Sequence, residues 1–287
     1  MKTPITPQFT VCVLLYGNYP ELLNRCLDSL SNPEWYPWFN LRIGWQGLGA
    51  QSETDLLSHV AKWQTAKLRG TCRDPLEMCL KGHSPFFKYP TMRRMFYEMP
   101  IKTPYIMWFD DDSFINTCAN GFFRGIQDFM EYGARKRKPD GTLTPADTAD
   151  MIGAKYVMAL RGNQRQYIED QPWYAGKPIA RRPGFITGGW WTIRTPIIQQ
   201  WNWPSEDLQH NGGDLLLGEL CHQQGYRIKH FTKGLGINCD ASGRCSTAPR
   251  RGHSQDPCGT NYVRPANHRS PNDEWQLSRS RYRRRRE

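Results

Sequence analysis

The sequence contains no long hydrophobic run. Among its 287 residues, the longest apolar stretches are Val11–Leu15 and Tyr105–Phe109, far below the roughly 20 residues that a membrane-spanning helix needs. Residues Met1–Pro7 also lack the apolar core of a secretory signal peptide. We therefore expect no transmembrane helix, and we expect the protein to act where it is made, in the cytoplasm.

Internal repeats and closely spaced cysteine pairs are also missing, so neither a repeat architecture nor a typical zinc finger is expected. The nine cysteines are an odd number, and in a cytoplasmic protein they predict free thiols rather than a disulfide framework. Cys239, Cys245, His253 and Cys258 lie within 20 residues of one another and are compatible with a structural zinc site. Their spacing is irregular, so free thiols are the expectation and zinc is the alternative.

Acidic residues are fewer than basic ones. The chain has 38 Lys and Arg against 27 Asp and Glu, which is a formal net charge of +11. Part of the excess lies in two clusters, Arg135–Lys138 and a tail, residues 279–287, with six arginines and one glutamate. Such a distribution favours a polyanionic partner, either nucleic acid, an acidic glycan or a membrane surface. The 38% hydrophobic residues suffice for a sizeable core and exclude overall disorder.

Strand-like and helix-like patterns alternate along the chain. Apolar, β-branched runs predict buried strands, and apolar residues at helical spacing predict amphipathic helices. Their order predicts an α/β fold with a mostly parallel central sheet flanked by helices and a ligand at the carboxyl ends of the strands. The predicted strands cover residues 10–16, 41–45, 105–109 and 184–192, and the predicted helices cover residues 21–30, 56–67, 88–98, 119–132 and 214–224. We expect one domain over residues 1–235 and a loop-rich, basic extension over residues 236–287.

Three consecutive aspartates follow one of the predicted strands. Tyr105–Phe109 runs directly into Asp110, Asp111 and Asp112, whose negative charges repel one another. Hard carboxylate oxygens suit Mg²⁺ or Mn²⁺, which typically bridge protein carboxylates to substrate phosphates. The triplet therefore predicts a divalent metal site, and a surface turn that caps the following helix is the alternative.

Several segments resemble known glycosyltransferases. Trp108–Ile115 resembles the DxD segment of GT-A glycosyltransferases, and Thr10–Leu30 resembles the opening nucleotide-binding strand and helix of their family 2 members. Gly188–Trp191, Asp214–Gly218 and Gly225–Ile228 follow the order found in family 2 enzymes and in Fringe-like β-1,3-glycosyltransferases. The resemblance implies a GT-A-like fold and an inverting, metal-dependent transfer of a sugar from a nucleotide sugar, with a UDP-sugar expected, to a hydroxyl group.

The resemblance also implies roles for individual residues. Asp112 would be the main metal ligand, Asp110 would approach the ribose or the metal, and Asp111 would support both. His230 would complete the metal shell, and Asp214 would be the general base, with capping of its own helix as the alternative. The expected donor-binding residues are Tyr16, Trp45, Gln46, Lys88, Arg94, Asp110, Asp111, Gly188 and Gly189.

The chain departs from the family 2 pattern at two places. The acidic residue expected after the second strand is missing from Gly44–Gly47, so contact with the nucleotide base would fall to Gln46 or to stacking on Trp45. Gly213 precedes Asp214, which leaves the usual Glu-Asp pair incomplete, and Glu206 with Asp207 is an alternative pair. Tryptophans near Gly188 and Pro204 are further candidates for stacking on a sugar or a base.

The acceptor stays open between two classes. The basic tail and the Arg135–Lys138 cluster favour DNA, as in phage enzymes that glycosylate hydroxymethylated pyrimidines, and would place the protein in a bacterial or phage-infected cytoplasm. A cell-surface polysaccharide or a protein glycan is the alternative. A nucleic-acid-binding module on an inactive transferase scaffold is a third reading, against which the intact Asp110–Asp112 and Asp214 argue. The oligomeric state is left open.

Overall fold

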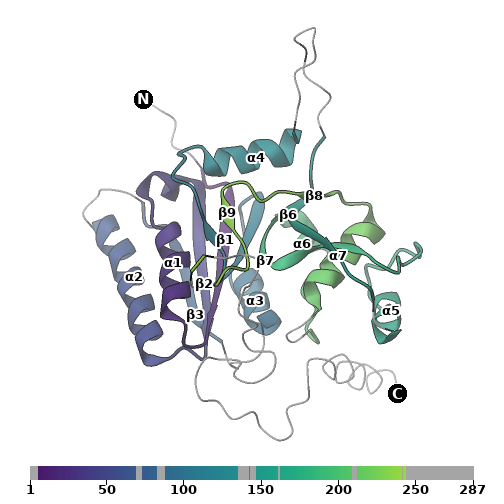
Figure 1. Cartoon of the computed structure of the whole chain (residues 1–287), viewed down its shortest axis with the longest axis horizontal. Helices are drawn as coiled ribbons and strands as arrows, with labels where there is room; N and C mark the ends of the chain where they lie inside the picture. Colours follow the sequence, from purple (N-terminus) through teal and green to yellow (C-terminus); the bar gives the residue numbers. More distant parts are fainter. Residues whose placement is uncertain are drawn as a thin grey trace, which may run out of the picture.

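The computed structural model describes residues 6–68, 73–82, 88–134, 142, 147–160, 162–208, 212–240 and 242–243. A seven-stranded sheet forms the centre of the molecule (Figure 1). Strand β7 runs antiparallel to its neighbours β4 and β6, whereas the other paired strands of this sheet are parallel. The predicted α/β fold with a mostly parallel sheet is confirmed. In spatial order the strands are β3 (Leu76–Lys81), β2 (Phe39–Gln46), β1 (Phe9–Tyr16), β4 (Tyr105–Asp110), β7 (Gly184–Arg194), β6 (Met151–Val157) and β8 (Ile228–His230).

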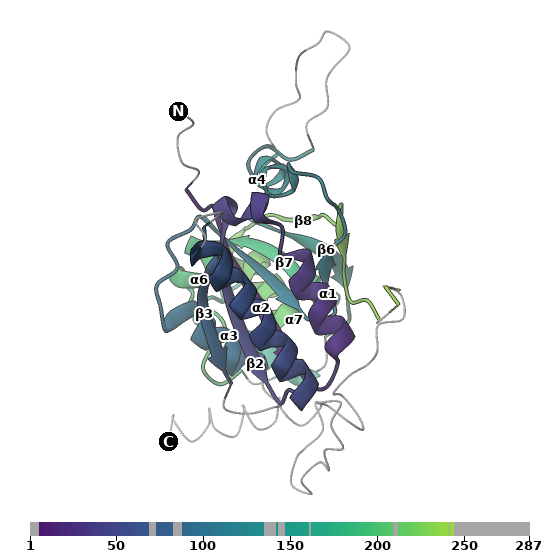
Figure 2. The same ribbon diagram turned by 90° about the vertical axis from the view of Figure 1, so that its left-hand side faces the viewer.

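Helices cover both faces of the sheet. Two of them, α1 (Pro20–Ser29) and α2 (Ala50–Leu68), pack on one face together, and they face the viewer in Figure 2. The same core cluster includes residues of η1 (Pro33–Trp38) and α4 (Phe122–Tyr132). The opposite cluster is formed with α3 (Lys88–Tyr97), α5 (Gly162–Glu169), α6 (Thr195–Gln200) and α7 (Gly213–Gln224). No helix in the described part of the chain is long and apolar enough to cross a membrane.

Strand β1 is buried on both faces, which explains its uninterrupted apolar sequence. Val11 and Val13 pack with the α1 and α2 side, whereas Cys12 and Leu14 pack with the α3 side. Because successive side chains point to opposite faces of a sheet, a strand between two helical layers needs apolar residues at every position. The sequence TVCVLLY meets this requirement.

The order of the strands reverses beside β1. The chain moves from β1 outward to β2 and β3 and then crosses to β4, which pairs with the other side of β1. In open α/β sheets, ligands bind where the order reverses, beyond the carboxyl ends of the strands. Tyr16 ends β1 and Asp110 ends β4, so the aspartate triplet lies at this position.

Candidate active site

Asp110 is held by two donors at the end of β4. Its Oδ1 accepts a hydrogen bond from Trp108 Nε1 at 2.8 Å, and its Oδ2 accepts one from Lys88 Nζ at 2.8 Å. The Lys88 ammonium also donates to the carbonyl oxygen of Gly188 at 3.1 Å. The Lys88 side chain is only 12% exposed, so this ion pair is well shielded from water. The Asp110 charge is therefore already compensated by a protein group.

A single glycine peptide connects this ion pair to Asp214. The Gly188 N–H donates to Asp214 Oδ2 at 3.2 Å, while the Gly188 carbonyl binds Lys88. A Cβ at position 188 would lie 2.8 Å from Lys88 Nζ, so a side chain there would displace the lysine. The structure thus brings together Lys88, Asp110, Gly188 and Asp214, which the sequence predicted separately, from α3, β4, β7 and α7.

Tyr89 packs against the start of α7, a contact that the sequence analysis missed. A Cβ on Gly213 would lie 2.2 Å from Tyr89 Cζ, so the tyrosine ring fits only against a glycine. Burial raises the pKa of the Tyr89 phenol well above its ordinary value, and the backbone N–H groups of Asp214 and Gly213 act in the opposite direction. The N-cap residue of α7 is Gly212, with no side-chain cap. The alternative role of Asp214 as a helix cap is therefore wrong.

The other two aspartates of the triplet differ in exposure. Asp111 is buried, whereas Asp112 is half-buried. The Asp112 carbonyl accepts the Cys239 N–H at 2.7 Å, and its Oδ1 lies 3.4 Å from Ser113 Oγ. Burial, with the nearby carboxylates of the triplet, raises the pKa of the Cys26 thiol well above its ordinary value. Cys26 is therefore a neutral thiol beneath the site.

The segment after β8 closes over the aspartate turn. Strand β9 (Leu235–Gly236) pairs with β5 (Phe114–Ile115), and the Asn238 N–H donates to Ser113 Oγ at 3.1 Å. A Cβ on Gly189 would lie 2.0 Å from Asn238 Oδ1, so Gly189 permits this close approach. The expected domain boundary at residues 235 and 236 falls inside β9, and the first residues of the expected extension form part of the site.

Cys239, in the same segment, takes part in a disulfide bond. The expectation of a free thiol is wrong for Cys239, and its sulfur is not available as a thiolate ligand for zinc. The other partners considered for zinc, Cys245, His253 and Cys258, lie outside the described residues. The expectation of free thiols is confirmed for Cys12, Cys26, Cys79, Cys118 and Cys221.

His230 is not close to the aspartates along the sheet. It belongs to β8, in the same row as Trp108 but three strand spacings away, which is about 14 Å between backbones. Its Nδ1 accepts the Lys155 N–H at 3.2 Å. Across the described residues, no group of three His, Cys, Asp or Glu side chains is placed to hold a metal.

The aspartates alone still fit a divalent cation of one kind. Mg²⁺ is usually held by one or two carboxylates, with substrate phosphates and water as the remaining ligands, so a cluster of three protein ligands is not required. Both carboxylate oxygens of Asp110 already accept protein hydrogen bonds. Asp112, which is half-buried, is therefore the residue that would hold such a cation.

The residues expected near the nucleotide base lie at the ends of β1 and β2. Gln46 is buried, and its Oε1 accepts a hydrogen bond from Thr91 Oγ1 at 2.8 Å. Trp45 is half-buried, with the Lys81 ammonium 4.6 Å from its ring centroid. Tyr16 is half-buried opposite Gln46 in the parallel register. Of these side chains, Tyr16 and Trp45 keep exposed surface for a ligand.

The basic residues of α3 point in different directions, as their spacing predicts. Lys88 faces Asp110, whereas Arg94 pairs with Glu98 and donates to the Lys81 carbonyl at 2.7 Å. Arg93 donates to the Pro204 carbonyl at 2.8 Å. The structure therefore places Lys88 in the site and Arg94 near β3.

The alternative base pair, Glu206 and Asp207, has other partners. Glu206 is mostly exposed and forms an ion pair with Arg93 at 3.2 Å, and Asp207 Oδ1 accepts a hydrogen bond from the Tyr167 hydroxyl at 3.1 Å. The structure links neither carboxylate to Lys88 by a salt bridge, within the residues described. Asp214 is thus the better placed of the candidate bases.

The tryptophans around the site belong to the core. Trp190, Trp191 and Trp203 are at most 3% exposed, and the Trp191 ring stacks on Trp108 at 5.9 Å between centroids. Their expected role of stacking on a sugar or a base is therefore wrong, because protein atoms already cover these rings.

No family model matches the chain, and no curated protein matches it. Among solved structures, it is similar to the mannosyltransferase PcManGT from Pyrobaculum calidifontis in complex with GDP-Man and Mn²⁺, with 11% identity, a TM-score of 0.44, and coverage of 79% of this chain and 55% of that one. For S. aureus TarS 1-349 the values are 13%, 0.40, 79% and 58%. For the nucleoside-diphosphate-sugar pyrophosphorylase from Vibrio cholerae they are 9%, 0.41, 79% and 94%.

The chain spans a little more than half the length of the first two of these structures. At such low identity and at TM-scores below 0.5, the likeness does not decide the activity. Any functional assignment has to come from the chemistry of the site itself.

Proposed function

We propose that the chain is a metal-dependent, inverting glycosyltransferase that moves a sugar from a nucleotide sugar to a hydroxyl acceptor. The observation that carries this proposal is the series of hydrogen bonds from Asp110 through Lys88 and Gly188 to Asp214. It combines an ammonium group and two carboxylates of different surroundings at the reversal point of the sheet. Such a transfer needs a cation for the leaving diphosphate and a carboxylate for the acceptor proton.

Lys88 and Asp112 support binding of the donor diphosphate. Lys88 lies in a part-buried position with two hydrogen bonds that fix its ammonium group, so its charge is directed before the donor arrives. A Mn²⁺ or Mg²⁺ ion held by Asp112 would supply further positive charge to the diphosphate oxygens. Asp110 keeps Lys88 in place, and its own oxygens are available to a ribose hydroxyl only as additional acceptors.

Asp214 supports the role of general base. It is half-buried and in the first turn of α7, and the Gly188 N–H fixes one of its two oxygens. The other oxygen can accept the proton of an acceptor hydroxyl as that hydroxyl attacks the sugar. Attack from the side opposite the leaving diphosphate inverts the configuration, which is the outcome expected with a base and without a protein nucleophile.

Tyr16, Trp45 and Gln46 support the position of the nucleotide base, at the ends of β1 and β2 beside β4. The buried Gln46 carboxamide already binds Thr91, so stacking on the half-buried Trp45 is the simpler contact. The expected donor is a UDP-sugar.

For the acceptor we propose DNA that carries hydroxymethylated pyrimidines. The support is charge: +11 for the whole chain, the Arg135–Lys138 cluster and the arginines of residues 279–287. Both clusters lie outside the described residues. A polysaccharide or protein glycan is the alternative acceptor, and an inactive scaffold that only binds nucleic acid is the alternative function.

We propose the cytoplasm of a bacterial or phage-infected cell as the location, because a DNA acceptor requires access to DNA. The disulfide bond of Cys239 counts against a reducing compartment, because disulfides rarely persist there. Measuring the redox state of Cys239 in cell extracts with a thiol-alkylating reagent decides between the two.

The proposed function is tested by incubating the full chain with a panel of nucleotide sugars and Mn²⁺ and measuring release of the nucleoside diphosphate. We expect release from one donor, stimulation by hydroxymethylated DNA, and loss of activity in a chelator. Asp112→Ala should abolish turnover, whereas Asp128→Ala, at an exposed position of α4, should not. Full activity of Asp112→Ala, or full activity in excess chelator, contradicts the metal dependence. Release by no donor contradicts the enzyme.

A further inference from the structure

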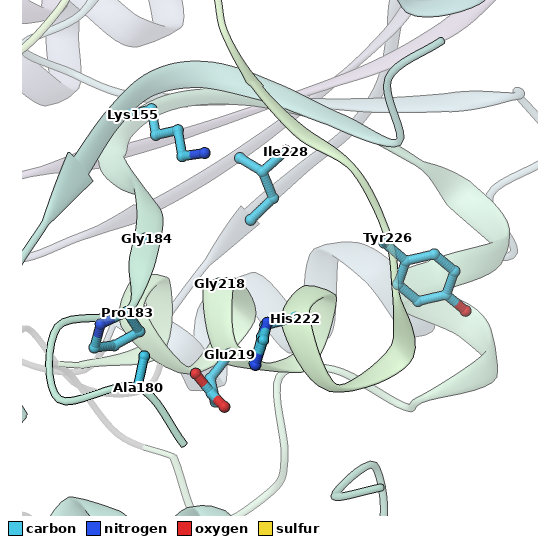
Figure 3. A pocket seen from close by; sticks show the side chains of 9 residues that line it. All are labelled: Lys155, Ala180, Pro183, Gly184, Gly218, Glu219, His222, Tyr226 and Ile228. Atoms are coloured by element: carbon cyan, nitrogen blue, oxygen red, sulfur yellow. The ribbon is translucent and has the colours of Figure 1, made fainter. Parts of the chain in front are cut away.

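A second cavity lies away from the candidate active site, on the other side of α7. It has a volume of about 200 Å³ and lies between α7, the β6–β7–β8 edge of the sheet and the chain around Ala180 and Pro183 (Figure 3). This is several times the roughly 30 Å³ that one water molecule takes in the liquid. Its lining contains none of Lys88, Asp110 or Asp214. It is a separate site that the proposed transfer reaction does not use.

Glu219 is the group in this cavity that lacks a partner. Its residue is fully buried, and its Oε1 accepts a hydrogen bond from Gln223 Nε2 at 2.8 Å. Its Oε2 is also buried but accepts no hydrogen bond from any described part of the chain. Burial raises the pKa of the Glu219 carboxyl above its ordinary value. A buried carboxylate oxygen without a donor is costly, so the site is suited to a ligand that supplies one.

The Glu219 carboxylate is held in a fixed orientation. Its partner Gln223 donates to the Lys177 carbonyl at 3.0 Å and accepts the N–H groups of Ala175 and Lys177 at 3.2 and 3.0 Å. Gln223 is therefore fully engaged and cannot turn to serve the second Glu219 oxygen. A prepared acceptor of this kind is a feature of a binding site and not of a surface carboxylate.

The far end of the cavity carries the opposite charge. In Figure 3, Lys155 and Glu219 lie at opposite ends of the labelled group, with Gly218 and Ile228 between them. The Lys155 ammonium forms no ion pair within the described residues. His222 lines the cavity near Glu219, but its Nε2–H already donates to the Pro178 carbonyl at 3.3 Å. The lining is therefore acidic at one end, apolar in the middle and basic at the other end.

We propose that this cavity binds a compact zwitterion, with its ammonium group on Glu219 Oε2 and its acid group toward Lys155. A plain amine would satisfy Glu219 but would meet the Lys155 charge, and a plain carboxylate would meet the reverse problem. The apolar middle, which includes Ala180, Pro183 and Ile228, suits a short hydrocarbon spacer between the two charges. An ω-amino acid has this chemistry.

Isothermal titration calorimetry of the full chain tests the proposal. The ligands are three series of increasing length: ω-amino acids from glycine to 6-aminohexanoic acid, the matching n-alkylamines, and the matching alkanoates. We expect one ω-amino acid to bind about tenfold more tightly than the amine or the alkanoate of equal length, since each charge-assisted contact is worth about that factor. Equal affinity of the three series, or no saturable binding by any ligand, overturns the proposal.

Two variants assign the contacts. Glu219→Gln keeps the shape and the Gln223 contact but removes the charge, and it should weaken the best ω-amino acid by about tenfold. Lys155→Met should reduce the affinity of that ω-amino acid to the affinity of its matching amine. Glu21→Gln, at an exposed position of α1, is the matched control and should bind as the wild type does. Wild-type affinity in Glu219→Gln overturns the proposal even if a ligand binds.

Discussion

Asp110 and Asp214 are the same type of residue in different surroundings. Asp110 has one oxygen on Trp108 and the other on Lys88, so its negative charge is compensated. Asp214 is half-buried, and its Oδ2 accepts the Gly188 N–H. A carboxylate whose ammonium partner is bound stays ionised and holds that partner, whereas a less engaged carboxylate can exchange a proton with a substrate. The division of roles between the two follows from these contacts.

Asp214→Asn should therefore lower the rate of sugar transfer by about a hundredfold, which is typical of removing a general base. The amide oxygen can still accept the Gly188 N–H, so the fold and the affinity for the donor should stay unchanged. Steady-state kinetics and donor titration measure the two effects. Asp207→Asn, whose carboxylate binds Tyr167, is the control. A near-normal rate in Asp214→Asn with a large loss in Asp207→Asn would move the base to the Glu206–Asp207 pair.

Glu219 predicts a dependence of stability on pH. Its pKa is raised above the ordinary 4.5 by burial, although the hydrogen bond from Gln223 and the charges of His222 and Arg165 act against the shift. The folded state therefore binds this proton more tightly than the unfolded state does. The stability from this proton is present at low pH and is lost as the pH rises from about 4.5 through the higher folded pKa.

Glu219→Gln should consequently become more stable relative to the wild type as the pH rises. The difference in free energy of unfolding should grow by about 1.4 kcal/mol for each unit by which the folded pKa is raised. Urea denaturation of both proteins at pH 4 and pH 8 measures it. A difference that is the same at the two pH values contradicts the prediction.

At the scale of secondary-structure elements, the first two residues of α3 hold the site together. Lys88 connects β4 to β7, and Tyr89 packs on the start of α7. The opposite end of α3 is anchored by the buried Arg42, which donates to the carbonyl oxygens of Met95 and Met99 and pairs with Glu77. Helix α3 is thus fixed at both ends, and the position of Asp214 depends on it.

Gly213→Ala should disturb this arrangement. An alanine normally stabilises a helix relative to glycine, but here its Cβ would lie 2.2 Å from Tyr89 Cζ. We expect a loss of about 1–3 kcal/mol in the free energy of unfolding and a lower rate of transfer, because the start of α7 must move. Thermal and urea denaturation measure the first, and steady-state kinetics measure the second.

Gly125→Ala in α4 is the matched control for that substitution. A Cβ at position 125 would meet no heavy atom within 4 Å, so the variant should be more stable than the wild type by about 0.4–1 kcal/mol. If Gly213→Ala were stabilised by the same amount as Gly125→Ala, the contact between Tyr89 and α7 would not constrain the helix.

The sequence predicted the elements that are buried along their whole length. Strands β1 and β4 are continuous apolar runs, and their predicted bounds agree with the structure to within one residue at each end. Strand β6 was missed because Lys155, Tyr156 and Val157 are exposed, so its sequence shows neither an apolar run nor strict alternation. Strand β3 was missed because most of its residues are not buried, as is common at the edge of a sheet.

Individual site residues were predicted from local sequence, but their contacts were not. Asp110 and Lys88 follow from a resemblance, whereas the ion pair between them depends on the packing of α3 against the sheet. The closure of Asn238 over Ser113 joins residues 125 positions apart, and no local pattern indicates such a contact. Gly213 was interpreted as an interruption of a motif, although Tyr89 requires a glycine there.

At the scale of the whole molecule, charge supports the DNA acceptor and can be tested separately from catalysis. Deleting residues 279–287 removes six arginines. The deletion should weaken binding to duplex DNA and reduce the salt dependence of binding, by about 0.9 in the log–log slope for each phosphate that the tail neutralises. Release of nucleoside diphosphate in the absence of DNA should stay unchanged.

Fluorescence anisotropy of labelled duplex DNA across a salt series measures that effect. If the intact chain binds DNA at low salt no better than a neutral protein does, the DNA acceptor must be replaced by a glycan. An unchanged salt slope after the deletion would show that the tail does not contact phosphates.

The central claim is that Lys88, held by Asp110 and Gly188, binds the diphosphate of a nucleotide sugar. Calorimetric titration of UDP and GDP into wild type, Lys88→Met and Arg94→Met tests it most directly, because both residues belong to α3 but only Lys88 contacts the site. We predict that Lys88→Met weakens binding of the diphosphate by at least about tenfold and that Arg94→Met binds as the wild type does. Wild-type affinity in Lys88→Met, or an equal loss in both variants, would contradict the claim.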